Sequence, residues 1–260
     1  MNKCLKIAIV QSSIIWHKAE QNLINYSEKI NSISETVDVV VLPEMFSTGF
    51  TMKPVEVAEE INGDTVIWMQ NTASKQGFAI CGSIVIKEEG KYYNRFVFVF
   101  PSGEIQYYNK RHLFSLAGEE KVYTAGKQKV IINYKGWKIC PQVCYDLRFP
   151  VFSRNTTNYD LLLYVANWPK PRILAWDSLL KARSIENMCY TVGVNRVGKD
   201  ENGYEFTGHS AVYNCLGKQI SISKYENEFI EVVEVTKNHI SEVRNKFNFL
   251  NDKDEFKLLL

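Results

Sequence analysis

The fold of this chain is organised around the stretch Ile139-Cys140-Pro141-Gln142-Val143-Cys144-Tyr145-Asp146-Leu147-Arg148-Phe149-Pro150. The apolar residues 130–143, with a turn at Lys135-Gly136, predict strands, and residues 146–154 predict a short helix. Cys144 therefore stands at a strand-to-helix corner, where free N–H groups and the positive end of a helix dipole lower the pKa of a thiol. The alternative is that Cys144 is a small buried apolar residue, as most intracellular cysteines are.

Composition and charge exclude several classes of protein. Of the 260 residues, 45% are hydrophobic and 13% are aromatic, so the chain can bury a sizeable core and disorder is not expected. The 31 basic and 29 acidic residues leave a formal net charge of +2, which argues against nucleic acid or an anionic membrane surface as the main partner. No apolar run reaches the length of a transmembrane helix, and the first residues show no signal-peptide pattern.

The six cysteines are expected to be free thiols. A chain of this length without a secretion signal fits a reducing compartment, so we expect a cytoplasmic location. Cys140 and Cys144 are too close together, with Pro141 between them, for a zinc knuckle, and no second Cys/His pair completes one. We therefore expect neither a metal nor another cofactor.

Strands alternate with helices over the first two-thirds of the chain, and hairpins are interleaved. Strands are predicted over 6–11, 37–42, 78–86, 92–100, 104–108, 159–166 and 190–197, and helices over 17–35, 64–75 and 172–189. After a turn at residues 200–203, antiparallel strands are expected to about Val235. This pattern predicts an α/β fold with sheets covered by helices. Without a linker-like segment, we expect a single domain over 1–260, whose polar C-terminal part from about 236 docks on the body or on a partner.

Three polar residues stand where predicted buried strands end, namely Glu44, Lys110 and Cys144. Strand ends and the loops after them are where α/β proteins place ligands. Each residue also has an ordinary interpretation: Glu44 as a surface loop charge, and Lys110 as part of a solvated basic patch with Arg111 and His112.

Together the three side chains form a coherent catalytic set. A glutamate can take the thiol proton as general base and later activate water. A lysine ammonium, with a backbone N–H near Tyr145, can stabilise the negative charge that develops on a carbonyl oxygen. This chemistry requires no histidine.

The order and surroundings of these residues resemble the nitrilase superfamily of carbon–nitrogen hydrolases. The resemblance is carried by six segments and covers nearly the whole chain: Leu42-Pro43-Glu44, Lys110-Arg111-His112-Leu113-Phe114, Cys144-Tyr145-Asp146-Leu147-Arg148-Phe149-Pro150, Ala166-Asn167-Trp168-Pro169, Ala182-Arg183-Ser184-Ile185-Glu186-Asn187 and Gly193-Val194-Asn195-Arg196-Val197-Gly198. It implies a four-layer α-β-β-α sandwich and a homodimer that pairs through the region after the cysteine.

The resemblance also implies a second glutamate, before Ala125-Gly126, that orients Lys110. Glu119 fits this position better than Glu120, although the adjacent carboxylate leaves both open. In the same way, Cys144-Tyr145-Asp146-Leu147-Arg148 is similar to the omega-amidases, which hydrolyse 2-oxoglutaramate and 2-oxosuccinamate to the 2-oxo diacids and ammonia.

An omega-amidase must hold the carboxylate of a small 2-oxo acid amide, and arginine provides the best bidentate geometry for it. Arg148, Arg172 and Arg196 are the candidates, and each can equally be a structural arginine. Tyr145, Phe114 and Trp168 are expected to wall the pocket, although an aromatic residue at a strand end is often part of the core.

Other functions remain open at this stage. Within the family, the alternatives are another amidase or a carbamoylase. Outside it, one alternative is a non-catalytic scaffold, which has no need for all three catalytic side chains. Another is a Cys–His peptidase, for which the chain offers only His17, His112, His209 and His239.

Overall fold

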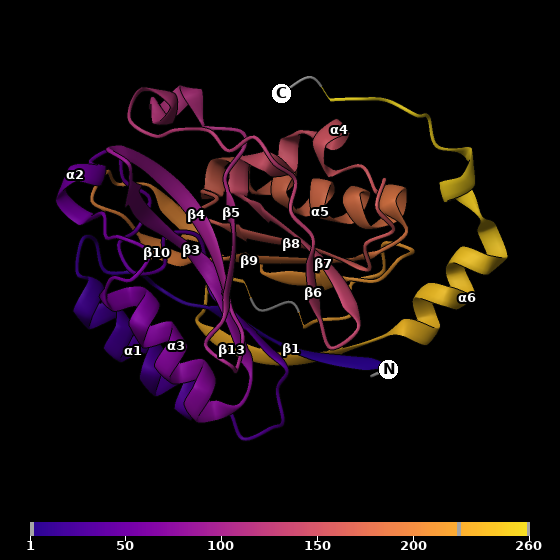
Figure 1. The fold of residues 1–260 in the computed structure, drawn as a ribbon, viewed down its shortest axis with the longest axis horizontal. Helices are drawn as coiled ribbons and strands as arrows, with labels where there is room; N and C mark the ends of the chain where they lie inside the picture. Colours follow the sequence, from indigo (N-terminus) through magenta and orange to yellow (C-terminus); the bar gives the residue numbers. More distant parts are fainter. Residues whose placement is uncertain (1–2, 223–224, 259–260) are drawn as a thin grey trace.

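Two larger sheets lie face to face and carry helices on their outer faces in the computed structural model (Figure 1). The structure describes residues 3–222 and 225–258. The ends of the predicted domain, 1–2 and 259–260, and residues 223–224 of the expected antiparallel strands lie outside the described residues. This arrangement confirms the expected four-layer α-β-β-α sandwich.

The first sheet has the order β13-β1-β2-β3-β4-β5 within the described residues. Its strands are β1 (Cys4–Gln11), β2 (Val39–Val41), β3 (Ala79–Glu88), β4 (Lys91–Val99), β5 (Ile105–Asn109) and β13 (Phe229–Thr236). Helices α1 (Ala19–Asn31) and α3 (Asp64–Gln76) cover its outer face. Both faces of this sheet are apolar because side chains alternate along a strand. In β1, Ile7 and Ile9 join the core between the sheets, whereas Ala8 and Val10 pack with the helices.

The second sheet has the order β12-β9-β8-β7-β6. Its strands are β6 (Ile132–Tyr134), β7 (Trp137–Val143), β8 (Leu161–Ala166), β9 (Tyr190–Asn195) and β12 (Ala211–Tyr213). Its three central strands β7, β8 and β9 are parallel and almost wholly buried, as expected for strands covered on both faces. Helix α5 (Ile173–Asn187) packs directly on Gly193, where a Cβ atom would lie 2.4 Å from Leu180.

Shorter elements complete the molecule. They are α2 (Pro54–Val57), the 3-10 helices η1 (Ser115–Ala117), η2 (Glu119–Lys121), η4 (Lys170–Arg172) and η5 (Phe249–Asp252), and the hairpin of β10 (Val197–Lys199) and β11 (Glu205–Thr207). The C-terminal helix α6 (Lys237–Phe247) lies at the edge of the molecule in Figure 1. It buries Ile240 and Val243, and its Arg244 donates to the carbonyls of Met188 and Tyr159. In the described part of the chain, no helix has both the length and the apolar character that a membrane span requires.

The predicted helix over 146–154 is interrupted and is not regular. The chain instead forms a 3-10 helix, η3 (Cys144–Arg148), followed by the short α4 (Pro150–Ser153). Pro150 has no N–H to donate, and Phe149 before it adopts the non-helical angles φ −115° and ψ 85°. A regular helix dipole therefore does not begin at Cys144.

The predicted helix over 17–35 is also too long. His17 has a φ of 52°, which excludes it from the helix, so α1 begins only at Ala19. By contrast, the predicted turn at Lys135-Gly136 is confirmed, because both residues have positive φ and join β6 to β7.

Candidate active site

Cys144 occupies a sharp corner at the end of β7, where η3 begins. Its φ of 44° lies in the left-handed region, which is unusual for a residue with a side chain. The buried Asp146 carboxylate supports the corner: it accepts the Val143 N–H at 2.9 Å and the Tyr108 hydroxyl at 2.8 Å. The strained conformation is therefore held by neighbouring groups and gives Cys144 a place in the wall of a cavity.

Glu44, Lys110 and Glu119 form a buried charged cluster. Lys110 Nζ lies 3.0 Å from Glu44 Oε1 and 2.9 Å from Glu119 Oε2, and all three side chains are at most 1% exposed. Glu119 also accepts the Phe114 N–H at 2.6 Å, whereas Glu120 is exposed. Of the two candidates, Glu119 therefore lies against Lys110 and Glu120 does not.

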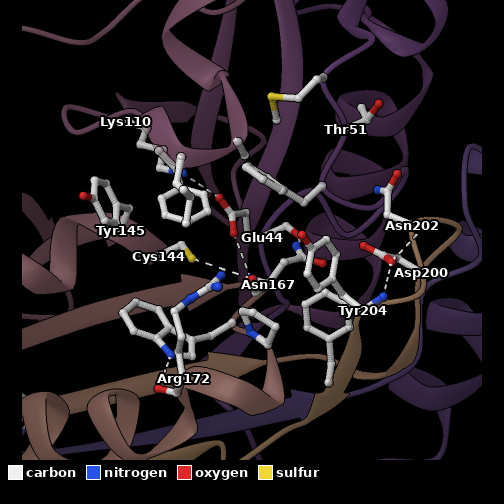
Figure 2. Close-up of a pocket in the computed structure, with 18 of the residues that line it drawn as sticks. Glu44, Thr51, Lys110, Cys144, Tyr145, Asn167, Arg172, Asp200, Asn202 and Tyr204 are labelled. Carbon is white, nitrogen blue, oxygen red and sulfur yellow. Dashed lines mark hydrogen bonds and ion pairs between the residues drawn. The ribbon is translucent and has the colours of Figure 1, made fainter.

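Asn167 connects this cluster to the thiol (Figure 2). Its N–H donates to Glu44 Oε2 at 2.8 Å and its side-chain amide to the Glu44 carbonyl at 2.5 Å. Its own carbonyl lies 3.9 Å from Cys144 Sγ. Because one residue contacts both side chains, Glu44 and Cys144 are held close together although they belong to different sheets.

The electrostatic surroundings keep the resting thiol protonated. Burial raises the pKa of Cys144 well above its ordinary value, the Glu44 carboxylate raises it further, and Lys110 only partly offsets the two. The expected lowering of this pKa is therefore wrong, since the corner is buried beside a carboxylate and lacks a regular helix. A thiol in this state needs a base to become a nucleophile.

Lys110 remains an ammonium in this environment. Burial alone lowers its pKa, but the Glu119 and Glu44 carboxylates outweigh burial, so the pKa stands above its ordinary value. Burial raises the pKa of Glu119, and the Lys110 charge offsets part of that effect. The cluster can therefore supply a fixed positive charge next to a carboxylate base.

A cavity of about 420 Å³ opens above these groups. The predicted wall residues Phe114, Tyr145 and Trp168 line it, and residues of the β10–β11 hairpin line another part of its wall (Figure 2). The remaining lining residues are Trp16, Phe50, Thr51, Met52, Lys53, Leu116, Ala117, Arg148, Asn167, Pro169, Asp200, Asn202, Tyr204 and Phe206. Among the described residues, no group of three or more His, Cys, Asp or Glu side chains is placed to hold a metal ion.

Two of the three candidate arginines line the cavity. The guanidinium of Arg148 lies 4.9 Å from the centre of the Trp168 ring, and that of Arg172 lies 5.1 Å from the centre of the Phe114 ring. Neither side chain forms a hydrogen bond or ion pair with any residue in 3–222 or 225–258. Two positive charges in the wall are thus available to an anionic ligand.

The expected role of Arg196 in substrate binding does not hold. This side chain is 1% exposed and lies outside the cavity lining. Its guanidinium donates to the carbonyls of Ile14, Val197 and Lys199 at 3.0–3.2 Å. Burial lowers its pKa to about 10. Arg196 therefore joins the segment after β1 to β10 of the small β10–β11 sheet.

Sequence reasoning missed three residues of the site: Asn94, Asp146 and Asn167. Asn94 donates its side-chain amide to Glu44 Oε1 at 2.7 Å and to Glu119 Oε1 at 3.3 Å. The sequence feature that could have indicated Asn94 is a polar residue within an otherwise apolar strand pattern. Asp146 follows Val143 by three residues, which is the spacing of a helix-capping carboxylate.

The histidines do not approach the thiol in a way that a Cys–His peptidase requires. Among the residues that line the cavity there is no histidine. His112, the nearest in sequence to the lysine, pairs its Nδ1 with Asp146 at 2.7 Å and stacks on Phe149. This arrangement favours the glutamate as the base.

Comparisons with known proteins agree with the geometry. The model of the carbon–nitrogen hydrolase family matches residues 6–245. The chain is 43% identical over 254 residues to the omega-amidase YafV of Escherichia coli (strain K12), and the match covers 98% of each chain. It is 32% identical over 251 residues to the 2-oxoglutaramate amidase of Bacillus subtilis (strain 168), with 95% of this chain and 96% of that protein covered.

Among solved structures, XC1258 from Xanthomonas campestris superposes with a TM-score of 0.95 at 40% identity. The superposition covers 98% of this chain and 99% of that one. XC1258 is described as a CN-hydrolase superfamily protein with an arsenic adduct in its active site.

Proposed function

This chain belongs to the carbon–nitrogen hydrolase family and is a hydrolase of amide bonds, and within that family we propose that it is an omega-amidase. Its substrate would be the side-chain amide of a small 2-oxo acid such as 2-oxoglutaramate or 2-oxosuccinamate. One observation carries the proposal: the cavity places Cys144, Glu44 and Lys110 beside two arginine side chains that lie over aromatic rings and form no hydrogen bond or ion pair within the described residues. The names of the relatives, omega-amidase and 2-oxoglutaramate amidase, support it.

In the first half of the reaction, Cys144 Sγ attacks the amide carbon while its proton passes to Glu44. The carbonyl oxygen becomes an oxyanion, which Lys110 Nζ and a backbone N–H near Tyr145 stabilise. Collapse of this intermediate breaks the carbon–nitrogen bond. Glu44 returns its proton to the nitrogen, so that ammonia leaves and a thioester on Cys144 remains.

In the second half, water replaces ammonia in the same position. Glu44 takes a proton from the water, and the resulting hydroxide attacks the thioester carbon. The carbon–sulfur bond breaks, the proton returns to Cys144 Sγ, and the 2-oxo diacid leaves. Glu119 would keep Lys110 oriented throughout, since it binds the ammonium through both oxygens at 3.0 and 2.9 Å.

Substrate recognition would rest on Arg148 and Arg172. A guanidinium binds a carboxylate through two parallel charge-assisted hydrogen bonds, which fixes orientation as well as affinity. Because each arginine lies over an aromatic ring, its planar group is already held before the substrate arrives. The substrate carboxylate would thereby place the distal amide near Cys144.

The direct test is ammonia release from 2-oxoglutaramate by the wild type, by Cys144→Ala and by Cys215→Ala as a control for loss of a buried cysteine. We expect release by the wild type and the control only. If Cys144→Ala retains full activity, the proposed nucleophile is wrong. If none releases ammonia while the wild-type thiol is still alkylated, the substrate is wrong, and a panel of other amides, carbamoyl amines and nitriles should follow. If the Cys144 thiol is not alkylated either, the result would favour the alternative that the protein is a non-catalytic scaffold.

The arginines can be tested with substrates that differ in charge. For Arg172→Met and Arg148→Met we expect kcat/KM for 2-oxoglutaramate to fall by about 10²-fold, while an uncharged amide of similar length is affected less than tenfold. Arg196→Met serves as the control, since its loss should lower stability without this discrimination. Equal losses on both substrates would contradict the assignment.

A further inference from the structure

Asn94 lies behind the active site and outside the lining of the cavity. Its side chain is 1% exposed on β4. The Nδ2 group nevertheless contacts both carboxylates of the cluster, Glu44 Oε1 at 2.7 Å and Glu119 Oε1 at 3.3 Å. Its Oδ1 atom accepts the Ser83 hydroxyl at 2.8 Å. An amide that touches both carboxylates but no cavity surface can act only through them.

The direction of these hydrogen bonds is set by a group that cannot reverse. The Met45 N–H donates to Ser83 Oγ at 2.9 Å, and a backbone N–H is only a donor. The Ser83 proton is then free to point at Asn94 Oδ1, which leaves the Nδ2 protons for the carboxylates. Met45 directly follows Glu44 and has a φ of 43°, so the chain of bonds runs from the strained backbone after the base to its carboxylate.

The two oxygens of Glu44 are not equally occupied. Oε1 accepts from Lys110 Nζ and from Asn94 Nδ2, and two donors satisfy a carboxylate oxygen. Oε2 accepts only the Asn167 N–H among the described residues, so one acceptor position remains on it. Oε2 is also the oxygen nearer to the thiol in the hydrogen-bond network, because Asn167, which donates to it, contacts Cys144 Sγ through its carbonyl.

We propose that Asn94, held by Ser83, is a positioning residue that occupies Oε1 of Glu44 and so makes Oε2 the atom that accepts the Cys144 proton. The inference rests on the proposed function, in which Glu44 is the base. Among the described residues, the titratable groups whose charge acts on Glu44 are Lys110, Glu119, Cys144 and Tyr123. The Tyr123 hydroxyl donates to the Thr51 carbonyl, so it does not replace Asn94.

A hydrogen bond to a carboxylate favours its charged form. Without the Asn94 donor, each carboxylate would keep its backbone N–H donor and a share of the Lys110 ammonium but lose the amide, so the charged form of the base would be less favoured. A protonated base cannot activate the thiol, so thiol reactivity falls at low pH. The pH at which this fall occurs, the acid limb of the pH profile, should therefore be higher without Asn94. A purely structural asparagine would not move this limb.

The experiment follows the rate of Cys144 alkylation by iodoacetamide against pH, measured by mass spectrometry on the peptide that contains Cys144. It requires no amide substrate. For Asn94→Leu, a change of similar size that removes the donor, we expect the midpoint of the acid limb to rise by about one pH unit. Ser83→Ala should shift it less, in the same direction.

The matched control is Asn155→Leu. Within the described part of the chain, this buried asparagine forms hydrogen bonds only with Tyr159 and Asn187, so its loss should lower stability without changing the midpoint of the acid limb. An Asn94→Leu midpoint equal to that of the wild type overturns the proposal. If Asn94→Leu does not fold, Ser83→Ala decides, because it removes a single oxygen, and an unmoved midpoint there overturns the proposal.

Two further results separate this inference from the proposed function. Glu44→Gln should abolish the acid limb, and an unchanged limb would show that Glu44 is not the base, so both proposals would fall. If the limb behaves as expected but 2-oxoglutaramate is not hydrolysed, the substrate assignment fails and the role of Asn94 stands.

Discussion

At the scale of single residues, the site depends on buried charges that satisfy one another. Taking Glu44, Glu119 and Lys110 out of water is costly, and their mutual attraction offsets this only when the remaining lone pairs are also hydrogen-bonded. The Phe114 and Asn167 N–H groups and the Asn94 amide supply those bonds. Removing Lys110 would leave two buried carboxylates without their cation next to Cys144, and removing a neutral donor would leave a carboxylate oxygen without one of its hydrogen bonds.

Lys110→Met should lower kcat for the amide substrate by on the order of 10²–10³-fold, because it removes a donor to the oxyanion. It should also destabilise the fold, since two carboxylates lose their cation. Steady-state ammonia release and urea unfolding measure the two effects. Lys129→Met, which removes a partly buried lysine that donates to the Arg154 carbonyl, is the control. A kcat within tenfold of the wild type would contradict the role given to Lys110.

At the scale of elements, the turn after β7 is stabilised by one carboxylate. Asp146 accepts the N–H groups of Val143 and His112, the Tyr108 hydroxyl and the His112 ring. These donors come from the loop that carries Lys110 as well as from the loop that carries Cys144. Asp146 therefore joins two segments of the candidate site that are far apart in sequence.

Asp146→Asn should lower the free energy of unfolding by about 2–3 kcal/mol, because a charged acceptor is lost and an amide N–H₂ faces existing donors. Tyr108→Phe removes a single donor and should lower it by about 1 kcal/mol. Urea unfolding of the two variants gives this ranking. A loss for Asp146→Asn no larger than that for Tyr108→Phe would rule out the joining role.

Glu228, just before β13, ties that strand to the end of β1 and to α1. Its carboxylate accepts the Ser13 N–H at 2.7 Å and the Lys29 ammonium at 2.9 Å. Burial alone raises its pKa, but the Ser13 and Lys29 bonds outweigh burial and lower the pKa to about 2. A carboxyl group with a lowered pKa in the folded state stabilises that state above its ordinary pKa, and this stabilisation disappears as the pH falls toward 2.

Glu228→Gln should therefore lower the free energy of unfolding by about 1 kcal/mol at neutral pH, a value reduced for solvent screening because the side chain is 40% exposed. The difference from the wild type should shrink as the pH falls from about 4.5 toward 2. Urea unfolding at several pH values measures it. A difference that stays constant over this range would exclude the ionised carboxylate as its cause.

At the scale of the whole molecule, the active site lies where the two sheets meet. Glu44 and Lys110 follow strands of the first sheet, whereas Cys144 and Asn167 follow strands of the second. The site therefore exists only when the sheets are packed against each other. The single domain over 1–260 and the homodimer stay predictions.

If the homodimer forms through the region after the cysteine, helix α5 offers a surface for it. Leu174 is 78% exposed and Ile185 is 49% exposed, and their separation of three helical turns places them on one face. We expect light scattering to give twice the mass of one chain, and Leu174→Glu with Ile185→Glu to favour the monomer. Ile24→Glu, on α1, is the charge control. A wild-type monomer at micromolar concentration would contradict the prediction.

Local patterns in the sequence were enough to predict the family, the α/β class and most of the strands. Apolar runs identify buried strands, and a turn such as Lys135-Gly136 depends on neighbouring residues alone. Glu44, Lys110 and Cys144 were found because each stands at the end of such a run and because their order resembles that of a known family.

The remaining features depend on contacts between distant segments. Asn94 reaches Glu44 across 50 positions, and Asn167 reaches it across 123. Arg196 could not be separated from Arg148 and Arg172, because only its position among the carbonyls of Ile14, Val197 and Lys199 removes it from the cavity. The pKa of Cys144 was predicted in the wrong direction for the same reason. Burial and the charge of Glu44 arise only when the two sheets pack together, and no local pattern encodes them.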